Sequence, residues 1–131
     1  MFKYIVSAII LVLLDSIYLN AIKDFFGKQI KKVQQKPMKV NLVGAILCYI
    51  ILILGINYFI IYQNKSILDA FLLGLLIYGV YETTNYALFS DWSVTTVMID
   101  SIWGGILFAL TTYITRYFFP VDFKKIYGKS I

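Results

Sequence analysis

Three acidic residues interrupt hydrophobic stretches of the sequence, and no basic residue accompanies them there. They are Asp15 in VSAIILVLLDSIYLN, Glu82 in LLGLLIYGVYETTNYALF and Asp100 in TTVMIDSIWGGILFAL. A charged side chain at the bilayer centre costs about 2.5–3.5 kcal/mol on insertion scales, and intramembrane acids mark functional sites by default. Carboxyl groups carry protons and ligate hard cations. The three acids therefore predict a polar site inside a membrane domain.

Other residues accompany these acids at helical spacing. We predict a polar intramembrane site formed by Asp15, Tyr78, Glu82, Asn85, Asp100 and Trp103. From the midpoints of the hydrophobic stretches and the helical rise, all three acids should lie in the same half of the bilayer. Beside Asp100, the small residues Ser101, Gly105 and Ala109 recur every four residues. Such a ridge is typical of a helix-packing seam.

The composition is that of a membrane protein. Of the 131 residues, 60% are hydrophobic and 15% are charged, whereas soluble domains contain about 45–50% apolar and about 25% charged residues. Four apolar runs, at about 4–22, 40–62, 67–89 and 94–118, each approach or exceed the roughly 20 residues that cross about 30 Å of hydrocarbon. We predict one multi-pass integral membrane domain, residues 1–131, folded as an all-α antiparallel bundle of four transmembrane helices.

The connection between the first two runs, residues 23–39, contains six Lys and one acid. Phe25, Phe26, Ile30 and Val33 would share one side of a short helix in the headgroup region, ended by Pro37. A solvated basic loop is the alternative. Either form suits anionic lipid as a partner, and we expect no nucleic-acid partner. The next two connections, QNKS and SDWS, are short, so the helices they join should be antiparallel neighbours.

Charge does not decide the orientation in the membrane. The net charge is +5 and the 12 basic residues divide equally between the two sides. Because the first helix usually dominates orientation, its basic flank favours a cytoplasmic first connection. The absence of His excludes imidazole metal ligands, and the lone Cys48 excludes an intrachain disulfide. The sequence leaves homo-oligomerisation open.

Three motifs occur in order along the chain. They are Leu14-Asp15 with Tyr18-Leu19, YGVYETTN from Tyr78 to Asn85, and Asp100-Ser101-Ile102-Trp103-Gly104. With these motifs the chain resembles a family of small bacterial membrane proteins known as domain of unknown function 2177. That family typically has Asp where this chain has Glu82. The resemblance covers nearly the whole chain and implies four helices and the same site residues, but it implies no reaction.

Three functions remain open from the sequence. The first is binding or translocation of a proton, a cation or a small polar group by Asp15, Glu82 and Asp100, assisted by Asn85. The second is an enzyme acting on a lipid or isoprenoid, although the sequence has no nucleophile, phosphate-loop or cofactor motif, and we expect no cofactor. The third is a structural or assembly role in a cellular or viral membrane, with the acids serving only to register the helices.

Overall fold

Four helices make up the computed structural model, which describes residues 1–122. They are α1 (Phe2–Gln34), α2 (Leu42–Ile56), continued by the π-helical turn η1 (Asn57–Ile61), α3 (Ile67–Leu88) and α4 (Val94–Phe118). With η1 counted as part of α2, each helix is long and apolar enough to cross a membrane, and the described residues contain no strand. The predicted all-α fold with four membrane-spanning helices is confirmed.

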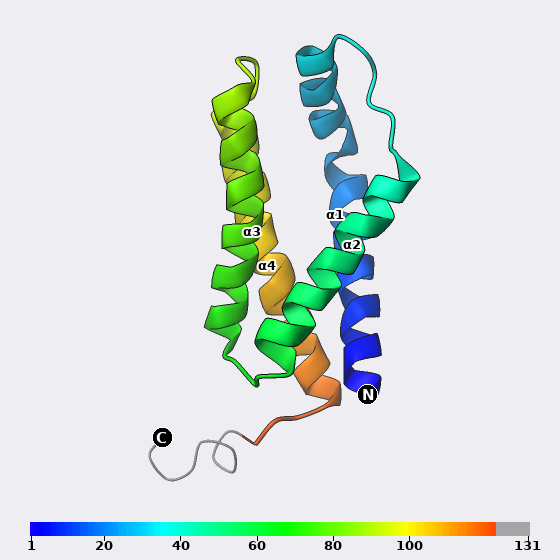
Figure 1. Cartoon of the computed structure of the whole chain (residues 1–131), viewed down its shortest axis with the longest axis vertical. Helices are drawn as coiled ribbons and strands as arrows, with labels where there is room; N and C mark the ends of the chain where they lie inside the picture. Colours follow the sequence, from blue (N-terminus) through cyan, green and yellow to red (C-terminus); the bar gives the residue numbers. More distant parts are fainter. Residues whose placement is uncertain (123–131) are drawn as a thin grey trace.

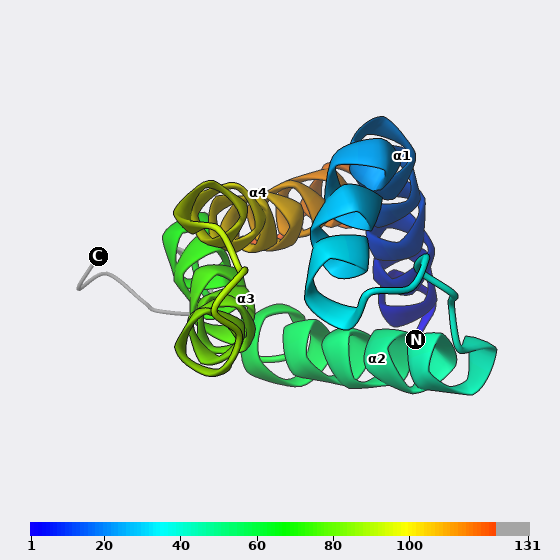
Figure 2. The same cartoon turned by 90° about the horizontal axis from the view of Figure 1, so that it is seen from above.

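The helices run alternately up and down (Figure 1). The C-terminal end of α1 and the α3–α4 loop lie together at one end of the molecule, which we call the first-loop end. Helices α3 and α4 make the most extensive contact, and α1 packs on α4. Helix α2 crosses the others obliquely, and its N-terminal end lies well away from α3 (Figure 2). The bundle is therefore tight on the α3–α4 side and looser beside α2.

Two glycines allow α3 and α4 to approach each other closely. A Cβ atom added at Gly74 of α3 would overlap the carbonyl oxygen of Gly104 in α4. A Cβ atom at Gly104 would lie 2.6 Å from the carbonyl oxygen of Gly74 and would also overlap the ring of Tyr78. The two backbones are thus in direct contact, as in the small-residue seams of membrane helices.

Helix α1 does not end near residue 22, where the first membrane span was predicted to end. It runs without interruption for 33 residues to Gln34, which corresponds to about 50 Å, so its last turns project beyond a hydrocarbon layer of about 30 Å. Gln35 ends the helix with a left-handed φ of 62°, and Pro37 follows two residues later. The basic segment is therefore largely helical, but it is an extension of α1 and not a separate helix.

The apolar side predicted for this extension is only partly correct. Phe26, Ile30 and Val33 are half-buried, whereas Phe25 is exposed. The most buried residue of the extension is the polar Gln29, which is 8% exposed. The extension is thus held against the rest of the protein by a specific polar contact as well as by apolar surface.

Candidate functional site

Asp15 of α1 accepts hydrogen bonds from two other helices. The Tyr49 hydroxyl of α2 donates to Oδ2 over 2.6 Å, and the Trp103 Nε1–H of α4 donates to Oδ1 over 3.0 Å. Asp15 is 6% exposed. Both carboxyl oxygens are therefore satisfied, and the single acid ties three helices together.

Asp100 of α4 lies next to this group. The Tyr18 hydroxyl of α1 donates to its Oδ1 over 3.1 Å. The Tyr18 ring in turn stacks on Trp103, with the ring centroids 4.4 Å apart and the planes within 5° of parallel. The stacked pair carries one donor to Asp15 and one to Asp100, so it links the two acids through aromatic side chains.

Glu82 of α3 is 0% exposed. Its Oε1 accepts a hydrogen bond of 2.8 Å from the Nε1–H of Trp92, a residue of the α3–α4 loop. No donor among the described residues serves Oε2, although the carboxyl group of Asp100 lies beside that of Glu82. Two carboxyl groups form a hydrogen bond only when one of them carries a proton, because an ionised carboxylate has no donor.

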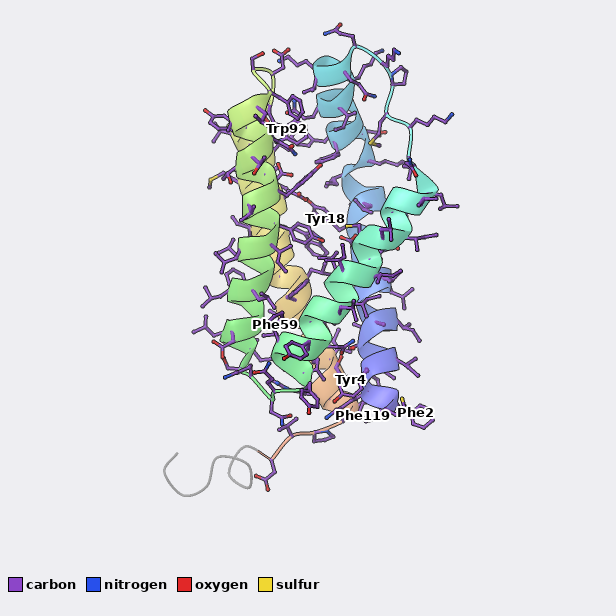
Figure 3. The ribbon with its side chains drawn as sticks, in the orientation of Figure 1. Phe2, Tyr4, Tyr18, Phe59, Trp92 and Phe119 are labelled. Carbon is purple, nitrogen blue, oxygen red and sulfur yellow. The ribbon has the colours of Figure 1, made fainter. Side chains whose placement is uncertain are left out.

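A cavity of about 350 Å³ adjoins these acids. It lies between the N-terminal half of α2 and the middle of α3, against α1 and α4. The residues that line it are Asp15, Tyr18, Leu19, Ile22, Phe26, Ala45, Cys48, Tyr49, Leu52, Ile77, Tyr78, Tyr81 and Asp100. Figure 3 shows Tyr18 projecting between the ribbons of α1 and α3, with Trp92 nearer the first-loop end. The wall is mostly apolar and aromatic, with two acids and several hydroxyl groups.

The structure brings most of the predicted site residues together, in two groups. The Trp103 indole donates to Asp15, whereas the carboxyl group of Glu82 lies beside that of Asp100. Within residues 1–122, no three His, Cys, Asp or Glu side chains are grouped in a way that could hold a metal ion. The three acids therefore do not form one common ligand set.

The remaining predicted site residues occupy different positions. Tyr78 lines the cavity and its ring packs on Gly104. Asn85 is half-buried, and its side chain lies near that of Tyr81. The assistance of the acids by Asn85 stays a prediction.

The predicted packing ridge on α4 faces α3 at two of its positions. The ring of Phe71 lies 2.6 Å from an added Cβ at Gly105, and Ser101 Oγ lies 3.9 Å from an added Cβ at Gly79. Ala109 is half-buried. The closest approach, however, is at Gly104, one residue before Gly105, which sequence reasoning did not assign to the seam.

Three further residues of the site were not assigned from the sequence. Tyr49 and Trp92 each donate to an acid, and Gln29 holds the loop that carries Trp92. The Gln29 Nε2 donates to the Asp91 carbonyl oxygen over 2.6 Å, and its Oε1 accepts from the Ser93 amide over 3.1 Å. Only Trp92 could have been suspected from the sequence, because it lies in a four-residue connection and a buried indole N–H needs an acceptor.

Residues 1–117 match the model of the family described as "Predicted membrane protein (DUF2177)". The chain belongs to this family. No curated protein and no solved structure matches it. Membership and the four helices together make it a multi-pass integral membrane protein.

Proposed function

We propose that the protein binds a proton inside the membrane, on the carboxyl pair Glu82–Asp100, and exchanges it with the adjoining cavity. The observation that carries the proposal is the placement of the Asp100 carboxyl group beside the fully buried Glu82. Glu82 Oε2 lacks any other donor among the described residues, and a proton shared with Asp100 supplies one.

The surroundings of the pair favour one proton over two negative charges. Glu82 and Asp100 are 0% and 8% exposed, and a third acid, Asp15, lines the same cavity. Two ionised carboxyl groups in contact would repel each other strongly in a medium of low dielectric constant. A single proton removes one charge and forms a hydrogen bond, which is how closely spaced carboxyl pairs commonly titrate.

Proton counting tests this proposal. Purified protein in detergent is brought from neutral to alkaline pH in weak buffer containing a pH-indicator dye. Wild type should release one proton per chain more than Glu82→Gln or Asp100→Asn, because an amide cannot hold the exchangeable proton but still donates a hydrogen bond. Asp69→Asn is the matched control, since Asp69 is exposed at the start of α3, and it should behave as wild type. Equal proton release by all four proteins would contradict the proposal.

A second candidate function is chemistry on a lipid or isoprenoid. One observation favours it: Asp15 and Asp100 face an apolar cavity within the membrane-spanning region, where an acid and a base could act on an apolar substrate. Mass spectrometry of lipids from cells with and without the gene tests this function. An unchanged lipid profile would exclude it for the lipids measured.

We further propose that the extension of α1 lies on the cytoplasmic surface and contacts anionic lipid. Lys23, Lys28, Lys31 and Lys32 are exposed along it, and clustered lysines gain about 1 kcal/mol each near an anionic leaflet. Sedimentation of a peptide covering residues 20–36 with vesicles tests the lipid contact. It should bind vesicles containing phosphatidylserine and not vesicles of phosphatidylcholine alone.

A further inference from the structure

We propose that the cavity beside the carboxyl pair is the binding site of a lipophilic organic cation, such as an alkylated ammonium attached to an apolar body. This inference rests on the proposed proton pair, because the cation would replace the proton held there. It is carried by three features of the cavity: the sign of its charged groups, its aromatic wall and its size.

The charged groups of the cavity are all acidic. Among the described residues that line it, Asp15 and Asp100 are the only Asp, Glu, Lys or Arg side chains. Asp15 already receives two hydrogen bonds, whereas Asp100 receives one from Tyr18 and lies beside Glu82. Asp100 is therefore the carboxyl group available to a cationic ligand, with Glu82 behind it.

Aromatic rings form a large share of the wall. They belong to Tyr18, Phe26, Tyr49, Tyr78 and Tyr81. Ring faces attract organic cations, and a cage of aromatic side chains is the usual way in which proteins recognise quaternary ammonium groups. The aliphatic residues between the rings, among them Leu19, Leu52 and Ile77, would contact the apolar body of such a ligand. A small hydrated metal ion would leave this apolar surface without a partner.

The size and the position of the cavity agree with this ligand. About 350 Å³ lies at the lower end of the range of small-molecule sites, roughly 300–1,000 Å³. The cavity is lined by residues of the N-terminal half of α2 and of the middle of α3. Figures 1 and 2 show that the N-terminal half of α2 diverges from α3. A lipophilic cation already dissolved in the membrane would need to cross no water to reach it.

Exchange with the proton balances the charge. The protonated pair carries one negative charge, and on binding the cation the pair loses one proton to solvent and becomes doubly ionised, so the net charge of the site is unchanged. The titratable groups that surround the pair or share its cavity are Asp15 and Tyr18 from α1, Cys48 and Tyr49 from α2, and Tyr78 and Tyr81 from α3. No lysine or arginine among the described cavity residues competes with the cation.

Equilibrium binding of benzyltrimethylammonium to the full chain in lipid nanodiscs tests the inference. The uncharged carbon isostere, neopentylbenzene, has nearly the same shape and serves as the ligand control in competition. Benzyltrimethylammonium should bind to wild type and to Asp69→Asn with equal affinity and release a proton. Its affinity for Asp100→Asn should fall about tenfold or more, because a contact with a charged partner is lost. Tyr81→Phe should retain binding and Tyr81→Leu should weaken it, since only the former keeps the ring.

The outcomes separate this inference from the proposed proton pair. The cation site would be overturned if neopentylbenzene competed as well as benzyltrimethylammonium itself, or if Asp100→Asn bound benzyltrimethylammonium with unchanged affinity. Neither result would change the number of protons counted on the carboxyl pair. Specific binding of the cation without proton release would support the cation site but overturn the exchange of cation for proton, and the proton count described above remains the separate test of the protonated pair. Cation-specific, Asp100-dependent binding with proton release supports both.

Discussion

Each buried acid of this protein is paired with an aromatic donor from another part of the chain. Tyr49 and Trp103 serve Asp15, and Trp92 serves Glu82. Indole and phenol groups suit this task because they place one polar atom on a large apolar body. The acids are therefore embedded without lysine or arginine partners among the described contacts, and a proton can neutralise them in place.

The Trp92–Glu82 hydrogen bond gives a prediction at the residue scale. Trp92→Phe keeps the ring but removes the Nε1–H, which leaves Glu82 Oε1 buried without its donor, and this should cost about 1–3 kcal/mol of unfolding free energy. Tyr62→Phe is the control, because it removes a polar group from a ring that is 64% exposed. No buried acceptor loses its donor in that variant, so its unfolding free energy should stay near that of wild type. Thermal unfolding in detergent, followed by circular dichroism, compares them, and equal losses would contradict the assignment.

The sequence predicted the buried acids better than their partners. An acid in an apolar run stands out by its insertion cost, so Asp15, Glu82 and Asp100 could be found without a structure. Tyr49 is one of many aromatic residues in this chain, and nothing local distinguishes a donor from a lipid-facing ring. Gln29 lies in a segment predicted to be either a short interfacial helix or a solvated basic loop. Their roles depend on the packing of helices that are distant in sequence.

At the scale of elements, the extension of α1 fastens the α3–α4 loop. Gln29 bonds to the loop on both sides of Trp92, and Phe26 makes an edge-to-face contact with the Trp92 ring, 5.8 Å between centroids. The Gln29 Oε1 also accepts from the Thr96 hydroxyl over 3.0 Å. The extension thus holds in place the indole that contacts Glu82. The prediction that the first helix ends near residue 22 did not include this contact. The lysines that begin at Lys23 indicate where the helix leaves the membrane, but they do not end the helix.

Removal of the Gln29 amide should loosen this end of the bundle. In Gln29→Ala the Ser93 amide loses its acceptor, so backbone amides near the start of α4 should exchange hydrogen faster than in wild type. Gln34→Ala, which changes an exposed glutamine of the same helix, should leave the exchange unchanged. Hydrogen–deuterium exchange with mass spectrometry measures both. Equal protection of residues 90–97 in the three proteins would show that the extension does not hold the loop.

The glycine contact between α3 and α4 gives a second prediction at this scale. Gly74→Ala places a methyl group on the Gly104 carbonyl, and the two backbones must separate, so the unfolding free energy should fall by about 1–3 kcal/mol or more. Gly55→Ala in α2 is the control, because its added Cβ would meet no atom within 4 Å apart from its chain neighbours and the backbone of its own helix. Its stability should stay near that of wild type or rise slightly, since alanine favours helix. A loss in Gly55→Ala as large as that in Gly74→Ala would contradict the close packing.

At the scale of the whole molecule, four spans place the first and third loops on the same side of the membrane. Single cysteines at Lys36 and at Ser90, introduced into a Cys48→Ser background, should react with an impermeant maleimide from one side only. A cysteine at Lys65, in the second loop, should react only from the opposite side. With the proposed orientation, Lys36 and Ser90 face the cytoplasm. Labelling of the cysteines at positions 36 and 65 from the same side of the membrane would contradict the four-span topology.

The sequence predicted the fold more completely than it predicted the arrangement of the site. Apolar length alone sets the number of spans, and all four were predicted within a few residues except for the end of α1. The separation of the acids into Asp15 and the pair Glu82–Asp100 was not predictable, because depth in the membrane places residues along a helix axis and not around it. The oblique path of α2, which opens the cavity, likewise depends on side-chain packing throughout the bundle.

The central claim is that Glu82 and Asp100 share one proton. Infrared spectroscopy of the protein in lipid at neutral pH tests it most directly, through the carbonyl stretch that only a protonated carboxyl group shows and that shifts in heavy water. Wild type and Asp69→Asn should show this band, and both Glu82→Gln and Asp100→Asn should lack it. Absence of the band from wild type, or its persistence in both variants of the pair, would contradict the account.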